Sequence, residues 1–168
     1  MSECVKVLRD ELPYNLHIFV NSVEFIAKVI DTLKLAPEAV KIVCSTSGDS
    51  RQENQRKLGN AYPIGQPSDP AKKINFYTST CFEGCDIFDP DGVTFIVSDG
   101  RKAHTLLDIS TLFTQICGRI RDSRYKTQIV HVYSTTKYSK AVTLDEFVAA
   151  TQRTLAAAEK VASDINAV

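Results

Sequence analysis

The sequence lacks any run of about eighteen or more apolar residues, which excludes a helix that spans a membrane. Its first residues do not show a basic flank followed by an apolar core, so we expect no secretory signal and a cytoplasmic location. The five cysteines are an odd number, which does not indicate a disulfide framework, and we expect them to be reduced. Internal repeats and low-complexity tracts are also missing from the chain.

The sequence has no excess of either charge, because 20 basic residues balance 20 acidic ones. A free-standing domain that binds DNA or RNA is usually basic, so this balance argues against strong binding by the chain alone. A balanced charge is still compatible with a domain that contacts a nucleic-acid backbone through only a few local residues. The length of 168 residues and the 43% apolar content are typical of one globular domain. Six basic residues fall within one stretch: Arg101, Lys102, Arg119, Arg121, Arg124 and Lys126.

Few residues suggest a metal site or a catalytic nucleophile. Cys81 and Cys85 are four positions apart, but no second pair of ligands follows at a suitable spacing, so we predict no metal site. A phosphatase with a cysteine nucleophile would need an arginine six positions after that cysteine, and no cysteine here has one. His17 and His131 lie inside strand-like runs, so we expect them in the core or at a sheet edge.

Short apolar runs alternate with longer segments along the chain. The runs are rich in Val, Ile, Phe or Tyr, as is typical of short strands, and most segments between them have apolar residues at helical spacing. The predicted strands are Leu16–Asn21, Lys41–Ser45, Ile74–Thr78, Val93–Val97 and Gln128–Tyr133. The predicted helices are Val23–Leu35, Asp49–Leu58, Leu106–Ile120 and Leu144–Ile165.

This alternation predicts an α/β fold in which helices cover both faces of a central, mostly parallel sheet. Ligands of such sheets usually lie outside the carboxyl ends of the strands. The sequence places polar residues after four predicted strands, at that edge: Asn21 and Ser22, Ser45 to Ser47, Thr78 to Thr80, and Ser98 with Asp99. We therefore predict a ligand site there.

Two runs are unusual against this background. Thr78–Asp86 reads TSTCFEGCD at the end of a predicted strand, and Gln115–Arg121 reads QICGRIR at the end of the predicted helix Leu106–Ile120. In this order the two resemble motifs V and VI of the superfamily 2 helicases, and the strand Leu16–Ser22 resembles motif IV. The resemblance implies the C-terminal RecA-like domain of a helicase or translocase, a three-layer sandwich over residues 1–140. Residues 141–168 would form a C-terminal helix that packs on the domain or leads to a further one.

The resemblance also implies a role for each motif. The catalytic residues would be Arg119, Arg121 and Gln115, because a guanidinium suits the oxygens of a transferring phosphoryl group. Four residues would lie toward the nucleotide: Glu83, Gly84, Asp86 and Gly118. Seven residues would contact the backbone of DNA or RNA: Asn21, Ser22, Ser45, Thr46, Thr78, Ser79 and Thr80.

The chain contains no GxxxxGK[ST] loop and no acidic cluster after an apolar strand. In the helicase family, ATP and Mg²⁺ are bound mainly by an N-terminal RecA-like domain. The resemblance therefore implies such a domain of the same protein as the partner of this chain. It also implies that the isolated chain does not hydrolyse ATP.

The arginine spacing departs from the commonest form of motif VI. That form has a second arginine three positions after the first, where this chain has Asp122. The GRxR spacing is closer to that of the origin-binding type of helicase. On a helix, a shift of one residue turns a side chain by roughly 100°, so Arg121 would not simply replace the missing arginine. The alternative is a helicase-like module that binds nucleic acid or protein without catalysis.

Overall fold

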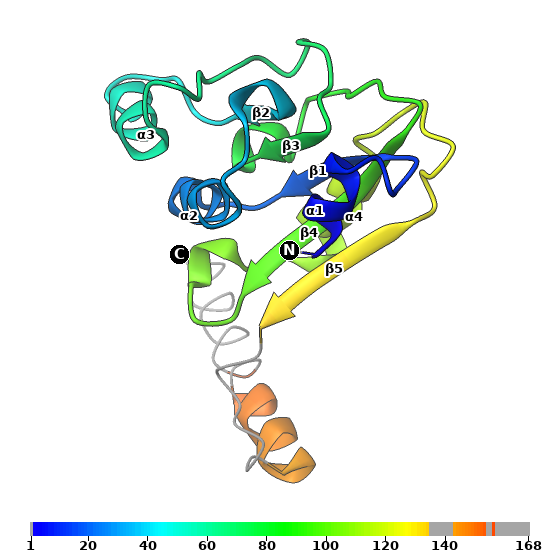
Figure 1. Ribbon diagram of the computed structural model, residues 1–168. Helices are drawn as coiled ribbons and strands as arrows, with labels where there is room; N and C mark the ends of the chain where they lie inside the picture. Colours follow the sequence, from blue (N-terminus) through cyan, green and yellow to red (C-terminus); the bar gives the residue numbers. More distant parts are fainter. Residues whose placement is uncertain (1, 135–142, 154–155, 157–168) are drawn as a thin grey trace. The chain divides into compact units, whose positions relative to one another are not determined.

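Five parallel strands form the central sheet of the computed structural model, which describes residues 2–134, 143–153 and 156. The strands lie in the order β2–β3–β1–β4–β5 (Figure 1). They are β1 (Asn15–Phe19), β2 (Val40–Val43), β3 (Ile74–Tyr77), β4 (Gly92–Asp99) and β5 (Ile129–Ser134). Every pairing between neighbouring strands is parallel. The predicted α/β fold with a parallel central sheet is thereby confirmed.

Helices cover both faces of this sheet, as predicted. They are α1 (Ser2–Leu8), α2 (Val23–Leu33), α3 (Ser50–Leu58) and α4 (Thr114–Cys117). On one face, Leu16 and Ile18 of β1 pack in one core with Ile26 of α2, together with buried residues of α1 and α3. On the other face, Phe19 packs in a second core with Ile116 of α4. Because successive strand residues point to opposite faces, each continuous apolar run supplies both cores. This is the three-layer arrangement of a RecA-like sandwich.

The sequence sets both ends of α2. Ser22 Oγ accepts a hydrogen bond from the Phe25 backbone N–H at 3.2 Å, which caps the first turn. Lys34 adopts a left-handed backbone with φ of 50°, and this conformation ends the helix. The helix therefore stops two residues before the predicted end at Leu35.

Two elements differ from the prediction. The sequence does not predict α1, because its 7 residues are too few to show a helical period. The predicted helix Leu106–Ile120 is wrong at both ends, since the chain forms a π-helical turn at Ile109–Phe113 and an α-helix only at Thr114–Cys117. Leu106 follows a separate 3-10 turn, and Ile120 is held in a β-bridge to Ile87.

The chain divides into two compact units, Met1–Ser134 and Thr135–Val168. Residues 144–153 of the second unit are helical, which agrees with the beginning of the predicted helix Leu144–Ile165. Thr143 and Glu146 cap that helix reciprocally, with N–H to side-chain oxygen distances of 2.8 and 3.3 Å. Most of the rest of that predicted helix, and the predicted boundary at residue 140, lie outside the described residues. None of the described helices has the length and apolar character that crossing a membrane requires.

The connections leave β1 and β4 in opposite directions. β1 leads through α2 to β2 at one edge of the sheet, whereas β4 leads through α4 to β5 at the other edge. In open α/β sheets, a ligand crevice lies at such a point, outside the carboxyl ends of the strands. Here Asn21, after β1, donates from Nδ2 to the carbonyl oxygen of His104, after β4, at 2.8 Å. The two loops are therefore joined across this point.

Candidate functional site

The fold brings the two unusual runs into contact. Arg121 donates from Nε to Asp86 Oδ1 at 2.8 Å, and Arg119 donates from Nη1 to the carbonyl oxygen of Cys85 at 3.1 Å. These partners are 35 and 34 positions apart in the sequence. Three of the predicted site residues, Asp86, Arg119 and Arg121, are thus assembled in one place, which we call the arginine group.

A short backbone bridge holds the arginine group together. The Ile87 N–H donates to the Arg119 carbonyl and the Arg121 N–H donates to the Ile87 carbonyl, both at 2.9 Å. Ile87 and Ile120 pair in parallel, and both side chains are buried. The chain is therefore extended at Ile120, and Arg119 and Ile120 are not helical as predicted. Side chains two positions apart in an extended segment point the same way, so the GRxR spacing places both arginines on the side of Asp86.

The two arginines differ in how firmly they are held. The side chains of Arg121 and Asp86 are 48% and 51% exposed, and an ion pair at such a surface contributes about 0–1 kcal/mol. An incoming phosphate can therefore compete for Arg121. Arg119 has a second bond, because its Nε donates to the Gln115 carbonyl at 3.0 Å. A guanidinium carries five N–H groups, so these two bonds do not use up its donors.

The remaining residues predicted near the nucleotide lie in turns beside this group. Gly84 has φ of 70°, a conformation that favours glycine, and is exposed with Glu83 just before Cys85. Gly118 ends α4, and its N–H donates to the Gln115 carbonyl at 3.1 Å. A Cβ added at Gly118 would approach Gln115 O only to 3.6 Å, so this fold does not itself require glycine there.

Asn21 connects the loops at the carboxyl ends of the strands. Besides its bond to His104, its Oδ1 accepts from the Ser79 backbone N–H at 3.4 Å. Ser79 and Thr80, which follow β3, are both exposed. Hydroxyl and amide groups of this kind suit contacts to phosphate oxygens, which position a nucleic acid without reading its sequence. We call Asn21, Ser79 and Thr80 the carboxyl-end group.

Three other residues predicted to contact nucleic acid are buried or hydrogen-bonded within the fold. The Ser22 hydroxyl caps α2, Thr78 is only 5% exposed, and the Ser45 hydroxyl is hydrogen-bonded within its own loop. Thr46, in contrast, is exposed after β2. The structure therefore leaves Thr46 and Ser79 better placed than Thr78 to meet a ligand.

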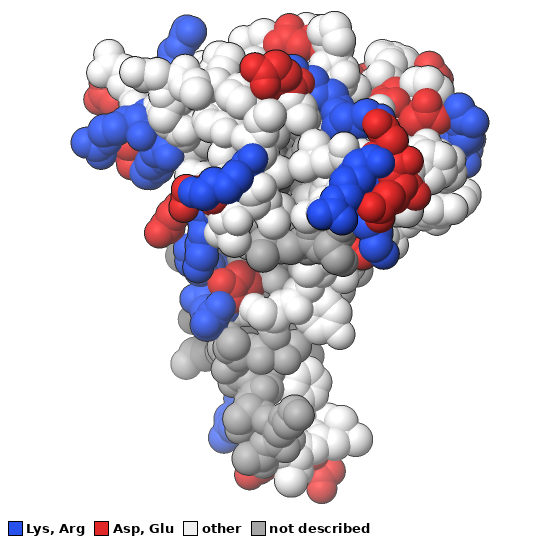
Figure 2. Space-filling model, in the orientation of Figure 1, with Lys and Arg blue, Asp and Glu red and all other residues white. Residues whose placement is uncertain are grey.

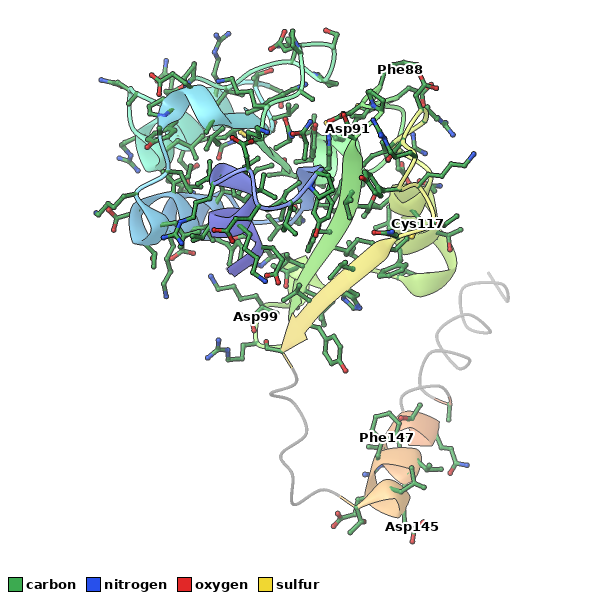
Figure 3. The ribbon with its side chains drawn as sticks, turned by 45° about the vertical axis from the view of Figure 1, so that its right-hand side comes forward. Phe88, Asp91, Asp99, Cys117, Asp145 and Phe147 are labelled. Carbon is green, nitrogen blue, oxygen red and sulfur yellow. The ribbon has the colours of Figure 1, made fainter. Side chains whose placement is uncertain are left out.

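The arginine group and the carboxyl-end group lie at opposite ends of the sheet. Asp86 and Phe88 line a small cavity with Lys41, near the start of β2, and with Pro67–Ala71, which precedes β3. Figure 3 shows Phe88 near the amino end of β4 and Asp99 at its carboxyl end. The segment Thr78–Asp86 therefore runs from one end of the sheet to the other, with a predicted ligand residue at each end.

About half of the basic residues on this domain are paired with acidic ones. On the face shown in Figure 2, blue and red side chains lie next to one another, in keeping with the balanced composition. The ion pairs include Lys102 with Glu24 at 3.1 Å, Arg101 with Asp99 at 3.3 Å and Arg124 with Asp91 at 2.7 Å. The predicted stretch of basic residues is therefore not a continuous positive surface.

A buried polar network at the amino ends of the strands was not predicted. Asp89 Oδ2 accepts from His17 Nε2 at 2.8 Å and from Asn15 Nδ2 at 3.0 Å, while His17 Nδ1 lies 3.0 Å from the Tyr77 hydroxyl. Burial raises the pKa of Tyr77, so this hydroxyl stays protonated. Burial alone would raise the pKa of Asp89, but hydrogen bonds from His17, Asn15 and the Asp91 N–H outweigh it and lower the pKa. His17 is a core residue, as its strand pattern predicts.

The chemistry of the described residues can be matched to the predicted ligands. The arginine group offers positive charge for a phosphate and a carboxylate for a ribose hydroxyl. Within the described parts of the chain, no group of three or more His, Cys, Asp or Glu could hold a metal ion.

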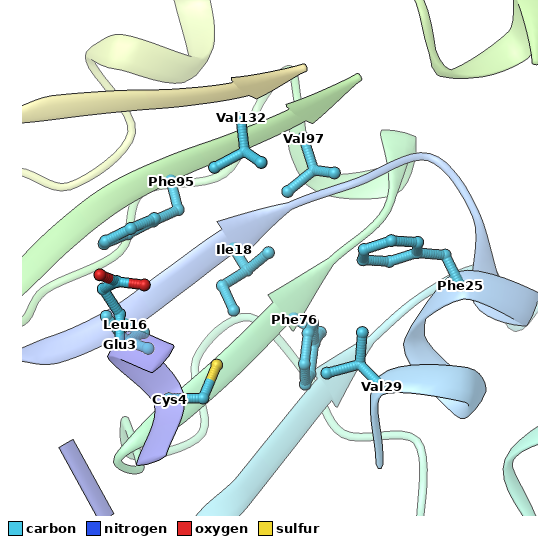
Figure 4. Close-up of a pocket in the computed structure, with 10 residues that line it drawn as sticks. All are labelled: Glu3, Cys4, Leu16, Ile18, Phe25, Val29, Phe76, Phe95, Val97 and Val132. Atoms are coloured by element: carbon cyan, nitrogen blue, oxygen red, sulfur yellow. The ribbon is translucent and has the colours of Figure 1, made fainter. Parts of the chain in front are cut away.

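A separate cavity of about 130 Å³ lies on the face of the sheet that carries α1 and α2 (Figure 4). Apolar side chains such as Leu16, Phe76 and Phe95 make up most of its lining, and Glu3 is the one charged residue among them. It offers little for a nucleotide to bind. The polar chemistry of the domain is instead at the two ends of the sheet.

The fold and these two groups define a parallel α/β domain with arginines at one end of its sheet and exposed polar groups at the other. Comparison with protein-family models, with curated proteins and with solved structures gives no match for this chain. These comparisons therefore assign no family to the chain.

Proposed function

We propose that this chain is the C-terminal RecA-like half of an ATP-dependent superfamily 2 helicase or translocase. The observation that carries the proposal is the contact between Thr78–Asp86 and Gln115–Arg121, through the Arg121–Asp86 ion pair and the bond from Arg119 to Cys85. The two runs resemble motifs that act on the same nucleotide. Their meeting in the folded chain is what such a shared site would require.

In this proposal, an N-terminal RecA-like domain of the same protein holds ATP and Mg²⁺. Arg119 approaches the γ-phosphate from this chain, where a fixed positive charge stabilises the charge that develops during phosphoryl transfer. Asp86 accepts a ribose hydroxyl. Arg121 exchanges its weak surface pair with Asp86 for a phosphate oxygen. Thr46 and the carboxyl-end group meet the backbone of DNA or RNA at the other end of the sheet.

The test is ATP turnover by the parent protein, measured with and without single-stranded DNA or RNA. We expect Arg119→Ala to lower kcat on the order of 10³-fold, the scale of a lost arginine finger. Arg124→Ala is the matched control, because Arg124 is 66% exposed in a surface pair with Asp91, and we expect no change in kcat. We expect the isolated chain to show no turnover. Equal rates for Arg119→Ala and wild type, or turnover by the isolated chain at a motor's rate, would contradict the proposal.

The second candidate is a non-catalytic helicase-like module that binds nucleic acid or a protein. Two observations favour it: both arginines already have partners inside the fold, and the chain carries no net charge. In this case the parent protein binds nucleic acid, but nucleic acid does not stimulate ATP hydrolysis. Arg119→Ala then lowers the stability of the domain and leaves any basal hydrolysis unchanged.

A further inference from the structure

Two thiols lie inside the segment that links the two ends of the sheet. Cys81 closes the 3-10 turn Ser79–Cys81, and Cys85 follows four positions later. Cys85 Sγ is 3.7 Å from the carbonyl oxygen of Thr80, the residue before Cys81. Cys81 belongs to the apolar cluster that includes Phe19 and Ile116, and Cys85 is partly buried against the same cluster.

The two thiols differ in their access to solvent. Cys81 is 0% exposed, and this burial raises the pKa of its thiol to about 12. Cys85 is partly exposed, next to the exposed Gly84. Exchange with a dissolved disulfide needs a thiolate that the disulfide can reach. Cys85 is therefore the thiol that reacts first, and Cys81 is the neighbour that can follow.

We propose that Cys85 and Cys81 are an oxidisable pair that closes to a disulfide when the protein meets a low-molecular-weight disulfide such as glutathione disulfide. In the first step, Cys85 loses its proton and attacks one sulfur of glutathione disulfide. The disulfide bond of the reagent breaks, and one glutathione leaves and takes up that proton. Cys81 then loses its proton and attacks the Cys85 sulfur, which releases the second glutathione with the second proton. Two protein thiols are oxidised and one glutathione disulfide is reduced to two thiols.

The new bond would span the turn that carries two contacts of the arginine group. Arg119 donates to the carbonyl of Cys85, and Arg121 pairs with the next residue, Asp86. Oxidation would therefore fix the shape of this turn. The inference rests on the positions of the thiols and holds whether or not the chain is half of a helicase.

The other three cysteines define the competing reactions. Cys117 is half-buried against the same cluster, and burial raises the pKa of its thiol. Cys44 is buried, and burial raises its pKa to about 11. Cys4 belongs to the core on the opposite face of the sheet. Cys117 is therefore the alternative partner for Cys85 that the experiment must separate.

The experiment uses the reduced, folded chain in buffers of increasing glutathione disulfide. Remaining thiols are alkylated, and the products are identified from intact mass and peptide mapping. We expect wild type to lose two of its five thiols, with Cys81 linked to Cys85 and no glutathione retained. We expect Cys81→Ser to retain one glutathione on Cys85, because no thiol displaces it. We expect Cys85→Ser to lose no thiol, and Cys117→Ser to behave as wild type.

Cys81→Ala repeats the test without adding a polar group to the core, and thermal unfolding checks that each variant is folded. The proposal is overturned if wild type keeps glutathione on Cys85 or links Cys85 to Cys117. It is equally overturned if Cys85→Ser oxidises at Cys81 as fast as wild type does.

Discussion

Replacing Asp89 by alanine tests the buried network at the amino end of the sheet. Asp89 is 4% exposed, and its carboxylate accepts hydrogen bonds from His17, from Asn15 and from the Asp91 N–H. Alanine removes all of these acceptors at once. His17 is 0% exposed, so its Nε2–H is left without a partner in a place that water does not reach.

The size of the effect follows from that burial. A buried donor that loses its partner costs about 1–3 kcal/mol, and the upper end applies here because the lost acceptor is a carboxylate. Asn15 and the Asp91 N–H are only partly buried, so water can replace their lost bonds at little cost. We therefore expect Asp89→Ala to lower the free energy of unfolding by about 3 kcal/mol. Asp89→Asn keeps an acceptor oxygen and loses the charge, so we expect a loss of about 1 kcal/mol.

Urea unfolding followed by far-UV circular dichroism measures these losses, since the chain has no tryptophan to report by fluorescence. The matched control is Asp91→Ala, because the Asp91 side chain pairs with Arg124 at the surface. Removing such a pair should cost less than about 1 kcal/mol. If Asp89→Ala is no more destabilising than Asp91→Ala, the network does not stabilise the fold and this reasoning is wrong.

Three further predictions use simpler changes. Because folding lowers the pKa of Asp89, its stabilisation is complete above the unfolded pKa of about 3.9 and is lost as pH falls through the folded pKa. The urea midpoint of wild type should therefore fall more steeply below about pH 4 than that of Asp89→Asn. Ser22→Ala removes the cap of α2 and should cost about 1 kcal/mol in urea unfolding, with Ser22→Gly costing less. Thr46→Ala and Ser79→Ala should weaken binding of single strands to the parent protein by similar factors for different sequences, measured by fluorescence anisotropy.

The sheet could be predicted because its strands are short runs rich in apolar residues. β1 to β4 are almost entirely buried, whereas β5 is an exposed edge strand that is still rich in Val, Ile and Tyr. Each strand begins and ends within two residues of its predicted range. The differences fall at polar residues such as Asn21 and Ser45, which the prediction counted as strand and which lie in loops. The sequence of a strand that is buried on both faces is apolar at successive positions, so a local pattern is enough to locate such a strand. Such local patterns do not predict the order of the strands in the sheet.

The site could be predicted only as two separate runs. The helix ends at Cys117, and the pairing of Ile120 with Ile87 holds the chain extended beyond it. No local period reveals such a partner. For the same reason, no local pattern indicates that Asp86 is the partner of Arg121. The His17–Asp89 pair, 72 positions apart, was missed because each residue alone has an ordinary explanation in a strand or a turn.

The segment Thr78–Asp86 is the structural link on which a motor function would depend. At one end its Ser79 N–H is bound to Asn21, and at the other its Asp86 is bound to Arg121. Between these ends, Cys81 and Phe82 are 0% and 2% exposed, so the segment cannot shift without disturbing the core. If nucleotide draws Arg121 away from Asp86, the strain falls on a few residues whose other end lies at the proposed nucleic-acid contacts. This short path, more than any single side chain, is the physical reason to test the chain as half of a motor.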